Sequence, residues 1–205
     1  MARKVLTTLD LNGPLTLTTA AGSSGQVLTS AGSTAVPTWT SVGKKVLQTA
    51  TLSGTSAISF TSIPSGYRDL EVRILVSTGV STSTTLTMTV NSLSTNIYSY
   101  VHQYVNGVSP SAITYAQGAG ATSATLIPGS FGGQASSAMR LTLYDYTSGS
   151  YKVGDVSWLG GPASGTYFWG FGNVFPKTTA AITQIDIAVG GTGGLNGTAV
   201  LIGVY

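Results

Sequence analysis

The stretch Arg68-Asp-Leu-Glu-Val-Arg-Ile-Leu-Val76 decides the fold class, because its side chains alternate between apolar and charged. One face of an extended chain would carry Leu70, Val72, Ile74 and Val76. The opposite face would carry Asp69, Glu71 and Arg73. A period of two is typical of a strand with one face buried and the other exposed. We therefore expect a half-buried antiparallel strand whose charged face is solvated or lies at an interface.

Shorter stretches on both sides of this strand repeat the pattern and are separated by Gly, Ser, Pro and Asn clusters. The expected strands are 45–49, 57–60, 86–90, 139–144, 185–189 and 199–205. No segment shows the 3.6-residue period of an amphipathic helix. The sequence therefore predicts an all-β protein. Its residues 43–205 should form an antiparallel, jelly-roll-like β-sandwich of about eight strands.

Residues 1–42 differ in composition from the rest of the chain. They contain short apolar pairs separated by Gly, Ser, Thr and Pro, with extended pieces expected at 9–12, 15–18, 26–29 and 36–39. Strands this short cannot bury a core of their own. We expect an extended arm for anchoring and oligomerisation that packs on another copy of the chain or on another protein.

Charged residues make up only 7% of the 205 residues, against about 25% in an average domain. The net charge is +3, and no run of Lys or Arg exceeds two residues. Since nucleic-acid affinity grows with the number of phosphates neutralised, we expect no nucleic-acid partner. No apolar stretch approaches the roughly 18 residues of a membrane helix, so we expect no membrane insertion. Ser, Thr and Gly must supply most of the surface.

The side chains that usually carry catalysis are scarce. The chain has no cysteine, which excludes disulfides and thiolate chemistry, and His102 is its only histidine, which excludes a multi-histidine metal site within one chain. The six carboxylates are scattered and form no recognisable acid and base pair. We expect a non-enzymatic protein without catalytic residues, cofactor or metal.

An aromatic stripe provides the first candidate contact surface. Every second residue from 98 to 104 carries a ring: Tyr98, Tyr100, His102 and Tyr104. In a strand these rings would point the same way. They would either stack on sugar rings of a host-surface glycan or pack across strands inside the sheet.

A second aromatic set is interleaved with glycines. It comprises Trp158, Tyr167, Phe168, Trp169, Phe171 and Phe175. The pattern indicates a strand, a flexible loop and a second extended segment. If exposed, these rings would form an adhesive patch. If buried, they would belong to the core or to an oligomer contact. Trp158, Tyr167 and Trp169 are the candidate glycan or interface contacts of this set.

Several motifs, taken in order, resemble those of tailed-bacteriophage fibre and virion surface proteins. The arm segments 5–13 and 22–30, with Pro37-Thr-Trp39, are similar to shaft-type N-termini of that family. The body resembles phage surface domains with a jelly-roll-like fold. The matching body segments are 60–70, 143–152, 178–187 and 197–205.

The resemblance implies a non-enzymatic virion protein, homotrimeric, anchored by its N-terminus with the C-terminal domain outward. It implies that residues 1–42 bind the phage major capsid protein or tail proteins, at the virion surface on the capsid exterior or the tail. The arm spans at most about 3.6 Å per residue, too little for a long fibre. This favours a capsid decoration protein of the cement or head-fibre type. The alternative is a tail-fibre or tail-tip adhesin that binds host carbohydrate.

Overall fold

The computed structural model describes most of the chain, in two units. The described residues are 22–23, 25–29, 37–79, 85–106, 113–128, 131, 136–160, 168–191 and 194–205. The first unit is Met1–Val42 and the second is Gly43–Tyr205, and each is described by itself. The extended pieces expected at 9–12 and 15–18 lie outside the described residues.

The described part of the first unit is a two-stranded antiparallel ladder. Its strands are β1 (Gln26–Thr29) and β2 (Thr38–Ser41). The hydroxyls of Thr29 and Thr40 lie 2.8 Å apart and join the two strands by a side-chain hydrogen bond. The prediction of extended chain at 26–29 and around Pro37 is thus confirmed.

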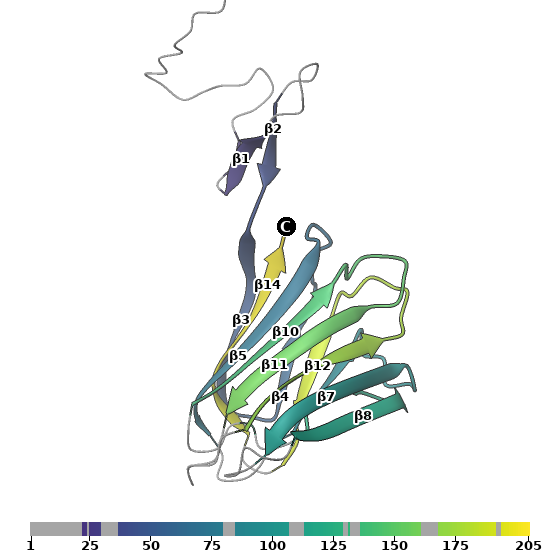
Figure 1. The fold of residues 1–205 in the computed structure, drawn as a ribbon. Coiled ribbons are helices and arrows are strands. Elements are labelled where there is room, and N and C mark those ends of the chain that lie inside the picture. Colours follow the sequence, from purple (N-terminus) through teal and green to yellow (C-terminus); the bar gives the residue numbers. More distant parts are fainter. Residues whose placement is uncertain are drawn as a thin grey trace, which may run out of the picture. The chain divides into compact units, whose positions relative to one another are not determined.

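The second unit is an antiparallel β-sandwich without helices in its described residues, so the predicted fold class is confirmed (Figure 1). The larger sheet has eight strands in the order β3-β14-β5-β10-β11-β12-β7-β8. Their bounds are β3 Lys44–Thr55, β5 Asp69–Gly79, β7 Tyr98–Asn106, β8 Ile113–Ala121, β10 Ser137–Tyr144, β11 Val153–Gly160, β12 Phe168–Pro176 and β14 Leu195–Val204. The smaller sheet has the order β4-β13-β6-β9. Its strands are β4 Ala57–Phe60, β6 Leu86–Val90, β9 Ala124–Ile127 and β13 Ile185–Val189.

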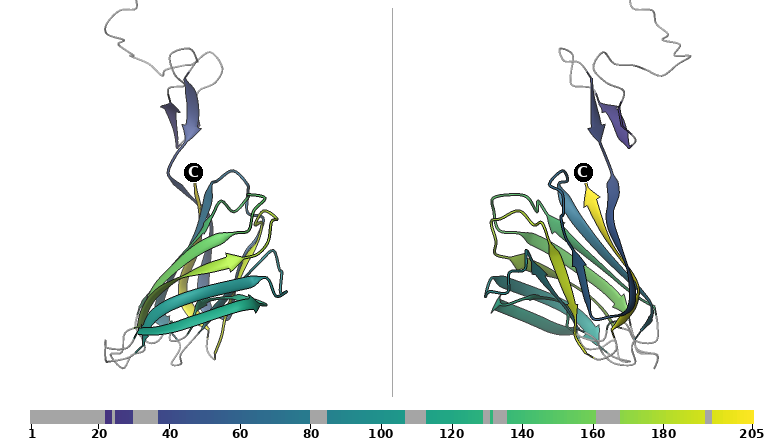
Figure 2. Two further views of the ribbon diagram at one scale, coloured as in Figure 1. Left: turned by 45° about the vertical axis from the view of Figure 1, so that its right-hand side comes forward. Right: turned by 180° about the vertical axis from the view of Figure 1, so that it is seen from behind.

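The two sheets differ in size, with eight strands in one and four in the other. The described residues of the second unit thus contain twelve strands, where the sequence predicted about eight. Figure 2 shows the two layers from two further directions. The edge strand β8, with the sequence ITYAQGAGA, escaped prediction because Ala and Gly give it little apolar alternation. The strand β9 has only four residues, too few for a period of two to stand out.

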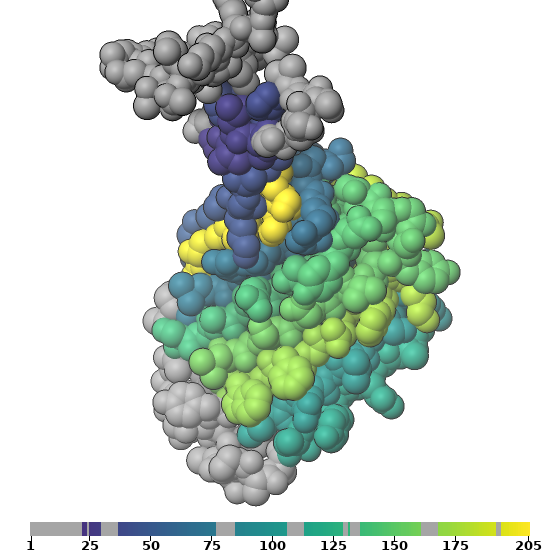
Figure 3. Space-filling model, turned by 45° about the horizontal axis from the view of Figure 1, so that its top comes forward, coloured from purple at the N-terminus to yellow at the C-terminus, as the bar shows by residue number. Residues whose placement is uncertain are grey.

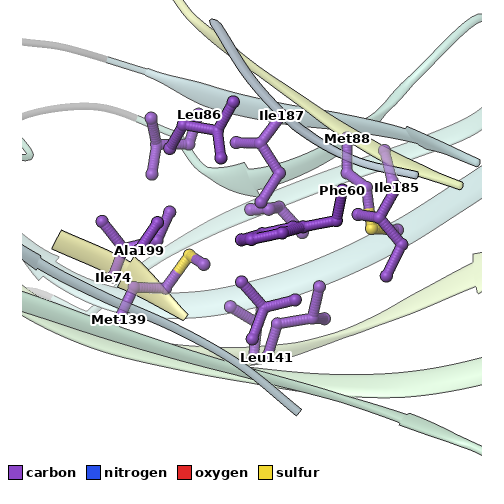
Figure 4. Close-up of a cluster of buried hydrophobic side chains, with 14 of the residues drawn as sticks. Phe60, Ile74, Leu86, Met88, Met139, Leu141, Ile185, Ile187 and Ala199 are labelled. Atoms are coloured by element: carbon purple, nitrogen blue, oxygen red, sulfur yellow. The ribbon is translucent and has the colours of Figure 1, made fainter. Parts of the chain in front are cut away.

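The core fills the space between the two sheets (Figure 4). Leu86 and Met88 of β6, with Ile185 and Ile187 of β13, line the smaller sheet's inner face. The larger sheet contributes Ile74, Met139, Leu141 and Ala199. Phe60 of β4 is only 1% exposed and is among the largest fully buried side chains. Burial of these apolar side chains is the main force that holds the sheets together.

Strand β5 has the apolar face that the sequence predicts, but its charged face needs correction. Leu70, Val72, Ile74 and Val76 are all buried. Asp69 and Glu71, which we expected on a face that is solvated or lies at an interface, are only 5% and 3% exposed within the chain itself, and Arg73 alone of the three is exposed. The reason is that cationic side chains cover both carboxylates.

The two buried carboxylates of β5 are each paired. Glu71 accepts hydrogen bonds from the ammonium of Lys44 and from Nε of Arg73. Burial would raise the pKa of Glu71, but these two hydrogen bonds outweigh it and lower the pKa below its ordinary value. Asp69 forms an ion pair with Arg68, at 2.7 Å. Glu71 therefore ties the start of β3 to β5 across the intervening β14.

The beginning and end of the second unit meet. The backbone N–H of Tyr205 donates to the carbonyl of Gly43 at 3.0 Å. The strand β14 lies inside the larger sheet, between β3 and β5, rather than at an edge. The earliest and latest strands of the sandwich are thus neighbours.

Candidate binding face of the larger sheet

The stripe of rings on β7 points into the sandwich. Tyr98 is fully buried and His102 is 1% exposed, while Tyr100 and Tyr104 are partly buried and pack against the core. The Tyr98 hydroxyl accepts from the backbone N–H of Val90 at 2.9 Å. The prediction that the four rings share a face is correct. Because that face is internal, Tyr98 and His102 pack inside the sheet, which is the second of the two alternatives that the sequence left open, and they are not glycan contacts.

His102 is held as a neutral ring in the core. Its Nε2 bonds the carbonyl oxygen of Thr125 on β9, and its Nδ1 has no partner among the described residues. The ring stacks on Tyr100, with centroids 5.4 Å apart, and meets the edge of Trp158 at 5.6 Å. Burial lowers the pKa of His102, against a smaller opposing effect of the bond to Thr125. These contacts join the two sheets and leave the imidazole no access to a substrate.

The second aromatic set divides between the two faces of the larger sheet. Trp158 and Phe168 point inward and are buried, so for these two rings the buried alternative holds, and Trp158 is a core residue rather than a glycan contact. Trp169 and Phe171 point outward and are 48% and 51% exposed. Tyr167 lies outside the described residues. Of the candidate contacts named from the sequence, Trp169 is therefore the exposed ring in the described part of the chain.

The strand register places Trp169 and Phe171 in two rows that cross the outer face of the larger sheet. The first row, from β5 to β8, is Leu75, Ala138, Leu159, Trp169, Val105 and Ile113. The second row is Arg73, Arg140, Ser157, Phe171, Gln103 and Tyr115. We call these two rows the outer face. Figure 3 shows its strands β10, β11 and β12 as adjacent bands between β5 and the pair β7 and β8.

A groove of about 530 Å³ opens at the β5 end of the outer face. The outward side chains that line it are Arg73, Leu75, Ala138, Arg140, Ser157 and Leu159. The short side chains of Ala138 and Ser157 stand between longer ones, which produces the hollow. The groove joins an aliphatic pair, Leu75 and Leu159, to two guanidinium groups on the neighbouring row.

The two arginines of the groove differ in their partners. They lie directly opposite each other on β5 and β10. Arg73 forms an ion pair with Glu71, whereas Arg140 forms none among the described residues. The nearest other carboxylate along β11 is Asp155, and it accepts a hydrogen bond from the Tyr144 hydroxyl. That bond raises the pKa of Tyr144. Arg140 is therefore available to an external anion.

Asp186 and Lys152 have partners within the fold. Asp186 accepts from Ser59 at 2.6 Å and from the Gln184 amide at 2.8 Å. Lys152 is buried, and its ammonium donates to the carbonyl oxygens of Ser148 and Ser150 in the turn that it closes. Within the described ranges, no three His, Cys, Asp or Glu side chains gather as a metal site would require. The described part of the chain also contains no helix able to cross a membrane.

No family model, curated protein or solved structure matches this chain. The outer face is therefore interpreted from its own chemistry. Sequence reasoning found Trp169 but missed Arg140, Leu159 and Tyr115 as parts of one surface. These residues lie on the strands β10, β11 and β8, and the pairing register of the larger sheet places them on one face.

Proposed function

We propose that this protein is a non-enzymatic structural protein of a tailed-phage virion. In this proposal it is a homotrimeric capsid decoration protein of the cement or head-fibre type. The arm, residues 1–42, anchors it to the capsid, and the sandwich projects outward. The observation that carries the proposal is the ladder of β1 and β2, two strands of four residues each in a unit of their own. A two-stranded ladder is marginal in water, so it requires a covering partner.

The use of the ionisable groups supports a structural role. In the described residues, Asp69, Glu71, Asp155 and Asp186 each have a hydrogen-bonding or ionic partner within the fold. A general acid or base needs a pKa near the working pH and a site open to substrate. Glu71 and His102 are both buried, and the pKa of each is lowered, so neither group has the access or the pKa that a general acid or base requires.

Homotrimerisation is the simplest way to cover the arm. Three arms wound together give each short strand a partner, and closed symmetry stops further growth. The low charge of the chain, 7%, suits a surface that neighbouring subunits cover. The native mass of the purified full chain tests this part directly, because a trimer weighs three times 20.8 kDa. A monomer at micromolar concentration would contradict it.

Attachment can be tested by deletion. Virions that lack this protein are mixed with either the full chain or residues 43–205, and the bound fraction is measured after sedimentation. The full chain should attach to the capsid, and the shortened chain should remain in the supernatant. A folded 43–205 that still attaches would refute anchoring by the arm.

A second candidate function is a tail-fibre or tail-tip adhesin that binds host carbohydrate. The exposed rings of Trp169 and Phe171 favour it, because exposed aromatic side chains on a flat face suit sugar rings. Symmetric reconstruction of the virion distinguishes the capsid-decoration function from the adhesin function. Density for the sandwich on the capsid supports decoration, whereas density at the tail tip supports adhesion.

A further inference from the structure

We propose that the groove on the outer face binds the carboxylated sugars of an acidic polysaccharide. Arg140 would hold a carboxylate, and the neighbouring sugars would lie on Leu159 and the rings of Trp169 and Phe171. This inference deepens the second candidate function by naming the ligand's charge and its site. It does not depend on whether the protein sits on the capsid or the tail.

The first argument is the pair of like charges at the groove. Arg73 and Arg140 are directly opposite across β5 and β10. Like charges in that position destabilise a sheet. Glu71 is already shared between Arg73 and Lys44, and Asp155 is bonded to Tyr144. Arg73 and Lys44 therefore share one carboxylate, and Arg140 has no ion pair among the described residues, so the groove presents a net positive charge.

The second argument is the chemistry of the groove walls. Leu75 and Leu159 are 59% and 56% exposed, so they offer aliphatic surface to a ligand. A ligand that fits must carry both apolar C–H surface and a negative charge. A sugar with a carboxylate has both, and a guanidinium can bind the two carboxylate oxygens at once.

The third argument is the distance to the exposed rings. Trp169 and Phe171 lie on β12, two strands from Arg140 on β10. At the usual strand spacing this is about 10 Å. A ligand that reaches both places must be longer than one sugar unit, so an oligosaccharide or polysaccharide is expected rather than a monosaccharide.

The position of the groove also argues against other occupants. The strands β5, β10, β11 and β12 are each paired on both sides, so the groove offers no free backbone edge for an acidic peptide to extend the sheet. A second copy packed face to face would bring two positively charged surfaces together, which repel. A polysaccharide needs neither a free edge nor a complementary protein face.

The test is to measure the binding of an oligogalacturonate to the full chain by titration calorimetry. The matched control ligand is the same oligomer with its carboxyl groups reduced to alcohols. A charge-assisted hydrogen bond contributes substantially to the binding free energy. The oligomer with reduced carboxyl groups lacks this bond, so its binding should be weaker by about tenfold or more. Binding should also weaken as salt is added. Equal binding of the two oligomers, or no binding of either, would overturn the inference.

Two pairs of variants locate the site. Arg140→Gln should weaken oligogalacturonate binding about tenfold, whereas Lys177→Gln removes an exposed cation outside the groove and should leave it unchanged. Trp169→Ala should weaken binding about threefold to tenfold, and Tyr151→Ala, which removes a 64% exposed ring outside the groove, should not. Arg140→Lys keeps the charge and tests the bidentate contact. Circular dichroism verifies that each variant is folded.

Other outcomes separate this inference from the adhesin function. Binding of a neutral glycan that depends on Trp169 but not on Arg140 would overturn the acidic ligand and keep the adhesin. If poly-glutamate bound as tightly as oligogalacturonate, and Trp169→Ala did not weaken that binding, the acidic polysaccharide would be overturned in favour of an acidic protein partner.

Discussion

At the scale of single residues, His102 shows how burial fixes a protonation state. One ring nitrogen bonds the Thr125 carbonyl, and the other lies in the core without a donor among the described residues. Charging this ring in the folded protein would place a cation between Tyr100 and Trp158, away from water. The lowered pKa of His102 follows from that cost.

This lowered pKa makes the stability of the fold depend on pH. The unfolded chain takes up a proton on His102 below about pH 6.5, whereas the native ring, whose pKa is lowered by burial, takes it up only at lower pH. The unfolded state then binds more protons, so the free energy of unfolding falls as the pH falls below that value. Urea unfolding between about pH 6.5 and pH 5 should show this loss, because carboxylates titrate mainly below that range.

The control for this prediction is His102→Gln. Glutamine does not titrate, and its amide can still donate to Thr125, so the pH dependence in this window should vanish. His102 is the only histidine of the chain, which makes the comparison direct. A wild-type protein without the loss, or a variant that retains it, would contradict the assignment.

The sequence placed His102 and the three tyrosines on one face but could not say which face. A period of two orients side chains relative to each other, and burial of that face depends on what packs against it. Both faces of the larger sheet carry rings here, since Trp169 and Phe171 point outward. Arg140 had no sequence signal at all, because its neighbours Arg73 and Ser157 come from other strands.

At the scale of elements, β12 shows why glycine alternates with aromatic residues. Its outward positions carry Trp169 and Phe171, and its inward positions 170 and 172 are glycines. A Cβ at Gly170 would lie 2.4 Å from the Trp158 ring. A Cβ at Gly172 would overlap Nδ1 of the His102 ring and would lie 2.3 Å from the backbone carbonyl oxygen of Val101. The missing side chains therefore make room for the rings of the neighbouring strands.

Gly172→Ala should therefore destabilise the sandwich. The Val101 carbonyl belongs to the ladder with β12 and cannot move away, so overpacking should cost about 2 kcal/mol or more. In a domain of this size the melting temperature should fall by roughly 5 °C or more. Differential scanning calorimetry measures the change.

The matched control is Gly149→Ala, where a Cβ would meet no atom within 4 Å. It should leave the melting temperature nearly unchanged or raise it slightly, because alanine restricts the unfolded chain. If both variants melted alike, steric exclusion at Gly172 would not explain the pattern of β12.

At the scale of the whole molecule, local periodicity predicted the class of the fold but not its strand order. The alternation in 68–76 identified β5 and its buried face correctly. The insertion of β14 between β3 and β5 pairs residues more than a hundred positions apart. No local pattern encodes such a partner, and the two-sheet division of eight and four strands depends on it.

The sandwich should fold without the arm. The buried residues of its core cluster run from Leu52 to Leu201, all within the second unit. Residues 43–205 should therefore melt within about 4 °C of the full chain, a difference of about 1 kcal/mol or less for a domain of this size. A much larger drop in calorimetry would show that the sandwich depends on residues 1–42.

The hydrogen bond between Tyr205 and Gly43 has a topological consequence. The second unit is nearly a closed ring, so a short linker from 205 to 43 could join its ends. New ends could open at the exposed Ser65 and Gly66, which belong to no strand, and every ladder would keep its partners. Proteins with adjacent ends commonly accept such circular permutation. The neighbour relations of the strands, and not the order in which they are synthesised, define this sandwich.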